Sequence, residues 1–330
     1  MHKLIDSFHR EIDYLRVSVT DRCNLRCIYC MPADGIIHKL QSQILSFEDI
    51  YRIVNVAVGL GIQKVRLTGG EPLIRKDVPL LIETLRNIEG LKEIALTTNG
   101  VYLSRYAHAL KIAGLDRLNI SLDSLVPEKF RKITRGGNIE MVLKGLEAAS
   151  LEGLVPLKIN TVLMKGINDN EILDFAQLTK TANVHVRFIE YMPTSLSRLY
   201  SGDLFFSCND ARNICSSLGE LDPSVGKKSG TARVFRIKGF YGTVGFISSL
   251  SGPFCGSCNK LRLTSDGCLK GCLHSSKYVD LKEALDKDAS DEELADLIKE
   301  AVASKPKSHN LLYRQLGHDS ENFSMCQIGG

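Results

Sequence analysis

The feature that most constrains the fold is an alternation of short apolar runs with longer helical patterns through the first part of the chain. The runs are rich in β-branched residues and lack a polar residue at every second position, which is typical of parallel strands buried on both faces. The clearest helix is expected to begin at Ser46, where Ser46 and Asp49 form a capping-box pattern, and to end near Gly59 and Gly61. Six buried strands are expected at residues 15–19, 65–68, 94–98, 117–121, 157–162 and 184–190.

Repeated βα units of this kind can form either a doubly wound sheet or a full or partial barrel. Both arrangements place the functional site at the carboxyl ends of the strands. The unusual residues of this part of the chain lie at those ends: 21–30, Gly69-Gly70-Glu71-Pro72, Asn99-Gly100 and Asp123. We therefore expect the site there.

The character of the sequence changes near residue 220. Four turn-forming residues indicate a linker: Gly219, Pro223, Gly226 and Gly230. We expect a first domain over residues 1–220 and a smaller domain over residues 221–330. The second domain is expected to contain strands at 233–237 and 242–247 and a helix capped by Ser290.

Charge and hydropathy exclude several classes of partner. The 42 basic and 38 acidic residues give a net charge of +4, which is too mild and too evenly mixed to indicate nucleic-acid binding. The first twenty residues carry scattered charges and no small-residue cleavage site, so neither a secretory signal nor a membrane anchor is expected. We expect a cytoplasmic protein without nucleic-acid or membrane partners.

Three cysteines lie close together after the first expected strand, as Cys23-x3-Cys27-x2-Cys30. In a cytoplasmic chain with ten cysteines, disulfides are not expected. An iron–sulfur cluster of the [4Fe–4S] type normally takes four cysteine ligands, so three would leave one iron open to a small molecule. Structural zinc would need a fourth ligand nearby, and no fourth cysteine is local.

A second group of cysteines has the spacing Cys255-x2-Cys258-x13-Cys272, with Cys268 inside the longer gap. If Cys268 joins the other three, four thiolates could close a structural zinc site. If Cys268 stands apart, three ligands again leave one iron of a cluster open. The spacing alone leaves both possibilities.

The first cysteine loop resembles that of the radical S-adenosylmethionine (SAM) enzymes, in which the open iron binds SAM and reduction yields a 5′-deoxyadenosyl radical. Tyr29 stands where that superfamily has an aromatic residue, and residues 69–72 match its second motif, where glycine permits close approach of the SAM amino group. The resemblance implies a partial (β/α)6 TIM-type barrel of the α/β class with a smaller C-terminal cluster-binding domain. It implies SAM contacts from Tyr29, Gly69, Gly70, Glu71, Ser121 and Met192.

The two cysteine groups together resemble the GTP 3′,8-cyclase family of molybdenum cofactor biosynthesis, and the resemblance spans nearly the whole chain. In that family the second cluster also has three cysteine ligands and its open iron binds guanine, which favours Cys272 over Cys268. Position 268 is usually not cysteine there. The resemblance implies two [4Fe–4S] clusters with six ligands: Cys23, Cys27, Cys30, Cys255, Cys258 and Cys272.

No phosphate-binding loop is present, because Gly226-Lys227-Lys228 lacks the required flanking residues. Side chains would therefore bind a triphosphate. The resemblance implies GTP contacts from Arg16, Arg66, Thr97, Lys158, Lys260, Leu261 and Arg262. Lys260 replaces a usual arginine, which keeps the charge but loses the bidentate fork. Catalytic roles are implied for Arg16, Arg262, Gly329 and Gly330, the last two as a tail that reaches into the site.

The resemblance also implies a reaction. The radical removes the ribose 3′ hydrogen of GTP, and the carbon radical attacks guanine C8 to give 3′,8-cyclo-7,8-dihydro-GTP. Further implications are a homodimer, a low-potential electron donor, and transfer of the product to cyclic pyranopterin monophosphate synthase. The alternatives are a radical SAM peptide or protein maturase with an auxiliary C-terminal cluster, and a binding protein stabilised by a cluster or by zinc.

Overall fold

Six parallel strands form the centre of the structure. The computed structural model describes residues 3–193, 202–223, 230–309 and 325–329. Each strand pairs with the next in sequence order, and its ends lie within one residue of those expected. The strands are β1 (Tyr14–Ser18), β2 (Lys64–Thr68), β3 (Glu93–Thr98), β4 (Arg117–Ser121), β5 (Leu157–Leu163) and β6 (Val184–Glu190).

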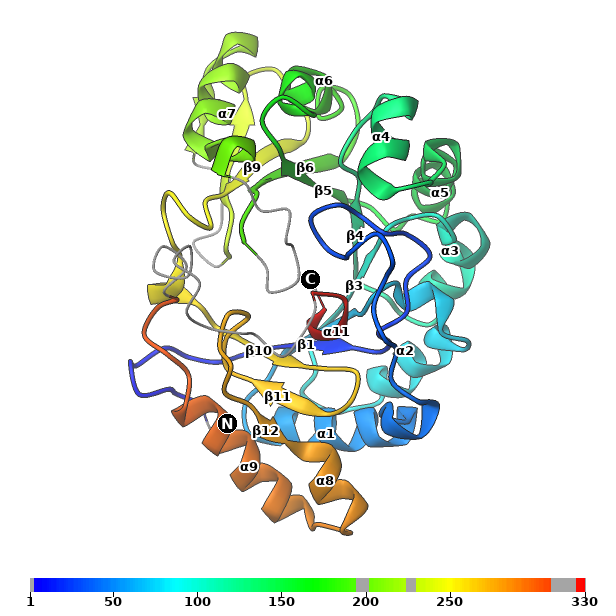
Figure 1. Cartoon of the computed structure of the whole chain (residues 1–330), viewed down its shortest axis with the longest axis vertical. Coiled ribbons are helices and arrows are strands. Elements are labelled where there is room, and N and C mark those ends of the chain that lie inside the picture. Colours follow the sequence, from blue (N-terminus) through cyan, green and yellow to red (C-terminus); the bar gives the residue numbers. More distant parts are fainter. Residues whose placement is uncertain (1–2, 194–201, 224–229, 310–324, 330) are drawn as a thin grey trace.

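Helices cover the outer side of this sheet. Figure 1 shows the strands following one another round an arc, with helices outside it. Since the sheet has two edges, the fold of the described residues is a partial (β/α)6 barrel, as expected. The outer helices are α1 (Phe47–Gly59), α2 (Val78–Arg86), α3 (Leu103–Ile112), α4 (Pro127–Thr134), α5 (Ile139–Leu151), α6 (Ile172–Gln177) and α7 (Cys208–Cys215).

The predicted start of α1 is confirmed in atomic detail. The Ser46 hydroxyl accepts the Asp49 backbone N–H at 2.9 Å, and the Asp49 carboxylate accepts the Ser46 N–H at 2.9 Å. This reciprocal pair satisfies two backbone donors that the first helical turn leaves unpaired. The helix therefore begins where the local sequence specifies.

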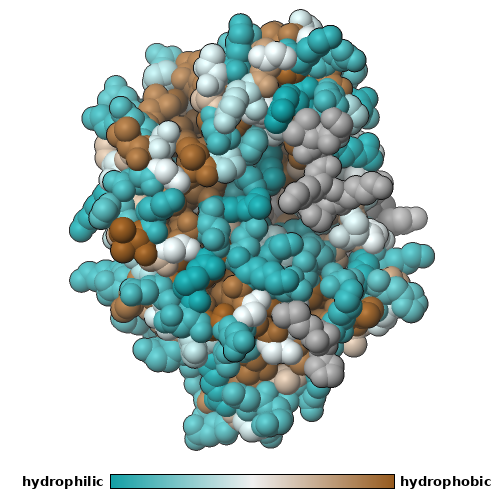
Figure 2. Space-filling view, turned by 180° about the vertical axis from the view of Figure 1, so that it is seen from behind, coloured by the Kyte–Doolittle hydropathy of each residue, from teal (hydrophilic) through white to brown (hydrophobic). Residues whose placement is uncertain are grey.

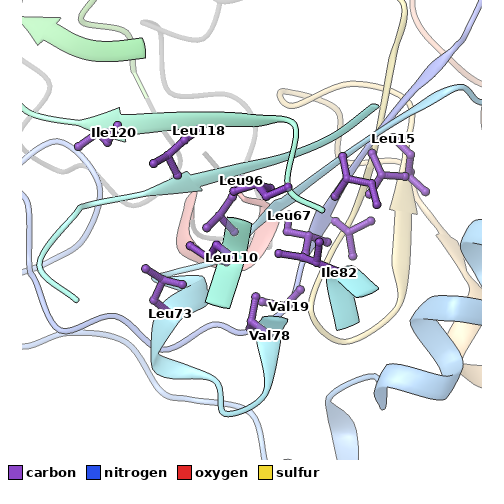
Figure 3. Packing of buried hydrophobic residues seen from close by; sticks show 14 of the residues in the cluster. Leu15, Val19, Leu67, Leu73, Val78, Ile82, Leu96, Leu110, Leu118 and Ile120 are labelled. Atoms are coloured by element: carbon purple, nitrogen blue, oxygen red, sulfur yellow. The ribbon is translucent and has the colours of Figure 1, made fainter. Parts of the chain in front are cut away.

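Apolar side chains fill the space between strands and helices. Figure 3 shows Leu67 and Leu96 of the sheet near Ile82 of α2 and Leu110 of α3. These four side chains are essentially inaccessible to solvent. Burying each contributes about 1.5–3 kcal/mol relative to an exposed position. This packing holds the strand ends in fixed positions, on which the site depends.

The C-terminal part of the chain extends the same sheet at both edges. Next to β1 lies β10 in parallel, followed by β11 and β12 in antiparallel pairing. Next to β6 lies β9 in parallel, followed by antiparallel β8 and β7. The bounds are β7 (Leu221–Asp222), β8 (Arg233–Ile237), β9 (Thr243–Ile247), β10 (Lys260–Leu263), β11 (Cys268–Lys270) and β12 (Val279–Asp280).

Among the described residues of the C-terminal part there are three further helices: α8 (Leu281–Asp286), α9 (Asp291–Ala303) and α11 (Met325–Ile328). Ser290 caps α9 as expected, since its hydroxyl accepts the Glu293 N–H. The expected strands at 233–237 and 242–247 correspond to β8 and β9. The strands of residues 221–280 share one continuous sheet with the strands of the barrel.

The molecular surface is mixed in character. Figure 2 shows one face, where hydrophilic residues predominate and apolar residues lie in small groups. Small apolar groups are ordinary on protein surfaces. Within the described residues, no helix combines the length and the apolar character needed to cross a bilayer.

Candidate active site

A cavity of about 1180 Å³ occupies the inside of the partial barrel. It is lined by both cysteine groups, although they are more than two hundred residues apart in the sequence. The pairing of β10 with β1 explains this, because the loop that precedes β10 is brought beside the start of the barrel. The lining cysteines are Cys23, Cys27, Cys30, Cys255, Cys258 and Cys272.

The loop that carries the first three cysteines is tightly turned. The N–H groups of Cys30 and Met31 both donate to the carbonyl of Cys27, at 2.9 and 3.0 Å. The loop is also tied to the end of α4, since Arg26 N–H donates to the Thr134 carbonyl at 3.0 Å. The Cys23 sulfur accepts the Leu25 N–H at 3.4 Å. The three thiols are thus held on one fixed backbone.

The chemistry of these thiols fits an iron–sulfur cluster. Burial and the nearby negative charges raise the pKa of Cys23 to about 11 and raise those of Cys27 and Cys30 further. Each thiol also opposes the ionisation of its neighbours. A strongly cationic partner such as iron would stabilise three thiolates here. Among the described residues, no three His, Cys, Asp or Glu side chains are arranged for a single metal ion.

The second group of cysteines is divided between two loops. Cys255 and Cys258 lie in a short turn before β10, and the Cys258 N–H donates to the Cys255 carbonyl at 3.2 Å. Burial raises the pKa of the Cys258 thiol, but the Lys305 ammonium, the Lys260 backbone N–H and the Lys260 ammonium together outweigh burial, so the pKa lies below its usual value. Cys272 follows β11 and faces the same cavity. The Lys305 and Lys260 groups stabilise the thiolate form of Cys258 relative to that of an ordinary cysteine.

Cys268 is placed differently from Cys272. It lies within β11, is buried, and packs with Leu273 and Ile328 away from the cavity. Burial raises the pKa of its thiol to about 12. Cys268 does not face the cavity that Cys258 and Cys272 line. The geometry therefore supports Cys272 as the third ligand of the second group.

The Gly69-Gly70 backbone packs directly on the first cysteine loop. The Gly70 N–H donates to the Thr20 carbonyl at 2.7 Å, and the Glu71 N–H donates to the Arg22 carbonyl at 2.7 Å. A Cβ added at Gly70 would overlap the Arg22 carbonyl oxygen. Glycine is required here because the two backbones touch. Gly69 and Gly70 both line the cavity.

The side chain of Glu71 has a structural position. Its carboxylate accepts the Thr98 hydroxyl at 2.7 Å and the N–H groups of Asn99 and Leu73 at 2.7 and 3.0 Å. Burial raises its pKa to about 7. Glu71 does not line the cavity, unlike the other residues expected to contact SAM. It joins the ends of β2 and β3 instead.

The other residues expected to contact SAM do line the cavity: Tyr29, Ser121 and Met192. The Tyr29 hydroxyl donates to Asp123 at 2.7 Å, and Asp123 also accepts the Val162 N–H at 2.9 Å. Burial raises the pKa of Asp123 to about 6. This network fixes the cysteine loop to the ends of β4 and β5.

Three arginines form a row across adjacent strands. Arg16 on β1 is the register partner of Arg262 on β10 and of Arg66 on β2. Arg66 donates to the Thr97 hydroxyl at 3.2 Å and to the Tyr14 hydroxyl. The expected GTP residues that line the cavity are Arg16, Arg66, Thr97, Lys158, Lys260 and Arg262. Leu261 does not, because strand alternation turns its side chain into the apolar core.

The structure adds Arg187 to this cationic group. Arg187 lies on β6 and faces the cavity near Lys158 on β5. Burial and the charges of Arg187 and its neighbours lower the pKa of Lys158 to about 7, and burial and Arg66 lower that of Arg187 to about 10. Cations that repel one another in a cavity favour an anionic ligand. A basic residue between Val186 and Phe188 in a buried strand was a recognisable sequence indication, of the kind that identified Arg16 and Arg66.

The C-terminal helix α11 packs on β1, inside the arc of strands in Figure 1. The carbonyl of Gly329 accepts Arg262 Nη1 at 2.6 Å and Arg16 Nη2 at 3.4 Å. Gly329 has φ of +75°, and a Cβ there would overlap the Thr68 hydroxyl. The expected tail residue Gly329 is thus at the arginine row, while Gly330 lies outside the described residues.

Comparisons with known proteins agree with these features. The family model for the radical SAM superfamily matches residues 17–179, and that for Molybdenum Cofactor Synthesis C matches residues 184–311. A GTP 3′,8-cyclase of Petrotoga mobilis is 49% identical over 327 residues, which is 99% of this chain and 100% of that protein. A GTP 3′,8-cyclase of Alkaliphilus oremlandii is 47% identical over 325 residues, which is 98% of this chain and 99% of that protein.

Solved structures resemble the chain in fold. Streptococcus suis SuiB bound to S-adenosylmethionine superposes with a TM-score of 0.60 at 15% identity, over 87% of this chain and 68% of SuiB. At this identity the likeness concerns the arrangement of strands and helices alone.

Proposed function

The chain belongs to the GTP 3′,8-cyclase family of radical SAM enzymes, and on this premise we propose that it converts GTP to 3′,8-cyclo-7,8-dihydro-GTP, the first step of molybdenum cofactor biosynthesis. The observation that carries the proposal is that both cysteine triplets and the cationic residues line one cavity. An enzyme of this kind must hold a radical source and a nucleotide face to face. The alternative of a peptide maturase is not favoured, because the full-length relatives are GTP 3′,8-cyclases.

One end of the cavity would hold the radical source. Cys23, Cys27 and Cys30 would bind the first [4Fe–4S] cluster, and the backbone of Gly69 and Gly70 would receive SAM. When bound, this cluster and SAM supply the radical that removes a hydrogen atom from the substrate. Tyr29, Ser121 and Met192 would orient SAM from the ends of their strands.

The other end would hold GTP. Arg66, Lys158 and Arg187 surround a space that suits a triphosphate, and their burial strengthens each charge interaction. Cys255, Cys258 and Cys272 would hold the second cluster at the guanine end. Arg16 and Arg262 both donate hydrogen bonds to the Gly329 carbonyl. These two arginines and the tail of Gly329 and Gly330 would then lie beside the reacting atoms as catalytic residues.

Lys260 remains part of the proposed GTP site. It lines the cavity, and its ammonium lies 5.4 Å from the centre of the Tyr14 ring. Burial lowers its pKa to about 8, so near neutral pH it is mostly charged. It can therefore contribute a positive charge, although not the paired donors of an arginine.

The wider setting is also part of the proposal. We propose a cytoplasmic homodimer that receives electrons from a low-potential donor and passes its product to cyclic pyranopterin monophosphate synthase. We also propose that residues 1–220 supply the SAM end and residues 221–330 the second cluster. The family membership supports the partners, and the origin of β7–β12 in the second part of the chain supports the division.

An anaerobic assay tests the function. Protein incubated with SAM, a strong reductant and GTP is expected to form 5′-deoxyadenosine and a cyclised nucleotide, both measured by chromatography with mass detection. Cys23→Ser is expected to form neither, since it removes a ligand of the first cluster. If unsubstituted protein forms 5′-deoxyadenosine but leaves GTP unchanged, the proposed substrate is wrong.

The depressed pKa of Lys158 gives a pH dependence. Above pH about 7 this lysine is largely neutral in the free protein, so binding of GTP must take up a proton from solvent. GTP affinity is therefore expected to fall as the pH rises from about 7 to about 9, by up to about tenfold per unit from this residue. Calorimetry without SAM, in two buffers of different ionisation enthalpy, measures both the affinity and the proton uptake.

Lys158→Met serves as the control for this measurement. It is expected to bind GTP more weakly at pH 7 and to show a flatter pH dependence, because one of the two lysines that titrate in this range is gone while Lys260, with a pKa of about 8, remains. The terminal phosphate of GTP, with a pKa of about 6, contributes little to the slope over this range. Equal slopes in the two proteins would show that Lys158 is not the group that takes up the proton.

A further inference from the structure

A buried lysine lies against the second cysteine group. Lys305 follows the end of α9, and only 3% of its surface is exposed. Lysine is rarely buried to this degree unless its charge is compensated. Its side chain lines the cavity beside Cys258 and Cys272. Lys305 has no role in the GTP or SAM contacts derived above.

All three donors of the Lys305 ammonium have acceptors. Lys305 Nζ donates to the Cys258 sulfur at 3.5 Å, to the Lys260 carbonyl at 2.8 Å and to the Gly271 carbonyl. An ammonium has three donors and no acceptor, so this set is complete. A hydrogen bond from a cation to a sulfur is strongest when that sulfur is a thiolate.

The three acceptors belong to both halves of the second cysteine group. Cys258 and Lys260 lie at the start of β10, whereas Gly271 is the residue immediately before Cys272. The backbone of Lys305 also packs closely on Gly271, since a Cβ added there would lie 3.0 Å from Lys305 Cα. Lys305 thus joins the loop of Cys255 and Cys258 to the loop of Cys272.

A second cation, Arg10, joins the segment after α9 to the turn that carries Cys255. Arg10 donates to the Cys255 carbonyl at 2.7 Å and to the Pro306 and Lys307 carbonyls at 2.8 and 3.1 Å. Its Nε forms an ion pair with Asp6 at 2.5 Å. The segment that carries Lys305 is therefore fixed to the turn that carries Cys255. The position of the ammonium does not depend on one flexible side chain alone.

We propose that Lys305 is a positioning residue for the second cluster, which brings Cys258 and Cys272 together as ligands and raises the reduction potential of the cluster through its N–H···S bond. The inference rests on the proposed function, since that supplies the second cluster. A cluster gains negative charge when it is reduced, and a buried cation hydrogen-bonded to a ligand sulfur stabilises that state. Loss of the Lys305 cation is therefore expected to lower the reduction potential of the second cluster. It is also expected to weaken the binding of iron, because the loops of Cys258 and Cys272 are no longer joined.

The test isolates the second cluster. The full chain with Cys23, Cys27 and Cys30 changed to serine can bind iron only at the second group, and its potential is followed by electron paramagnetic resonance during reductive titration. Lys305→Met in this background is expected to lower the potential and to lose iron after anaerobic reconstitution. Lys305→Arg, which keeps the charge, is expected to restore most of the iron. Lys307→Met is the matched control, because Lys307 is exposed two residues away.

The outcomes separate this inference from the proposed function. If the background protein itself binds no cluster, the proposed function fails. If it binds a cluster whose potential and iron content are unchanged in Lys305→Met, the role of Lys305 is wrong. Should the methionine variant not fold, lysine-specific ¹⁵N labelling in a Lys260→Arg background provides a second measurement. A ¹⁵N coupling to the reduced cluster is then expected, and its absence would overturn the proposal.

Discussion

Cys272→Ser is expected to abolish GTP cyclisation. The variant is expected to keep the first cluster and to cleave SAM slowly. Cys272 lines the cavity beside Cys258, so its loss removes one of three ligands from the second cluster. Replacing even an outer partner of a metal site costs about 10–100-fold in affinity or activity, and loss of a ligand should cost more. Iron content, 5′-deoxyadenosine and cyclised nucleotide are measured on the same anaerobic preparation.

Cys268→Ser is the matched control for this experiment. Cys268 is buried with Leu273 and Ile328 on the far side of its strand from the cavity. The substitution places a hydroxyl in an apolar site, so a loss of stability of about 1–3 kcal/mol is expected with iron content unchanged. Full iron in Cys272→Ser together with lost iron in Cys268→Ser would reverse the ligand assignment.

Gly329→Ala is expected to reduce cyclisation by about 100-fold or more, because the tail can no longer place its carbonyl between Arg16 and Arg262. An alanine would need a left-handed backbone conformation, which costs roughly 1–2 kcal/mol, and its Cβ would overlap Thr68. The tail would therefore move away. The measurement is the turnover of GTP together with the melting temperature, which should change little because the tail is terminal.

Gly59→Ala provides the control for a glycine substitution as such. Gly59 is exposed at the end of α1, and a Cβ there has open space around it. This change should leave turnover intact and slightly stabilise the helix, by about 0.5–1 kcal/mol. Turnover of Gly329→Ala that equals that of Gly59→Ala would exclude the tail from catalysis.

The barrel could be predicted from the sequence because its signals are local. A run of β-branched residues marks each of the six strands, and Ser46 with Asp49 marks the start of α1 within a single turn. The C-terminal strands were harder. The strands β8 and β9 were expected, but β11 has three residues and β12 has two, too few to carry a pattern of their own. They form because the edge beside β10 offers unpaired backbone groups.

The site could be predicted in part for the same reason. Cys23, Cys27 and Cys30 lie within eight positions, so their spacing alone indicated a cluster. The family resemblance favoured Cys272 over Cys268. The structure gives a physical reason for that preference, because Cys268 is buried within β11, whereas Cys272 follows the strand and lines the cavity. Arg187 was missed although its place in a buried strand marked it as it marked Arg16 and Arg66. Lys305 was missed because it follows the end of α9, where a basic residue carries no local mark of the cavity that it faces.

By itself the sequence determined the barrel strands, the helix caps and the two sets of thiols, since each depends on residues that are neighbours along the chain. Only the tertiary structure decided which of these groups share one cavity. Gly329 meets Arg16 and Arg262, and Lys305 meets Cys258, because the C-terminal strands and α11 pack on β1. Such contacts come from burying apolar faces between distant segments, and that arrangement is set by the packing of the whole chain.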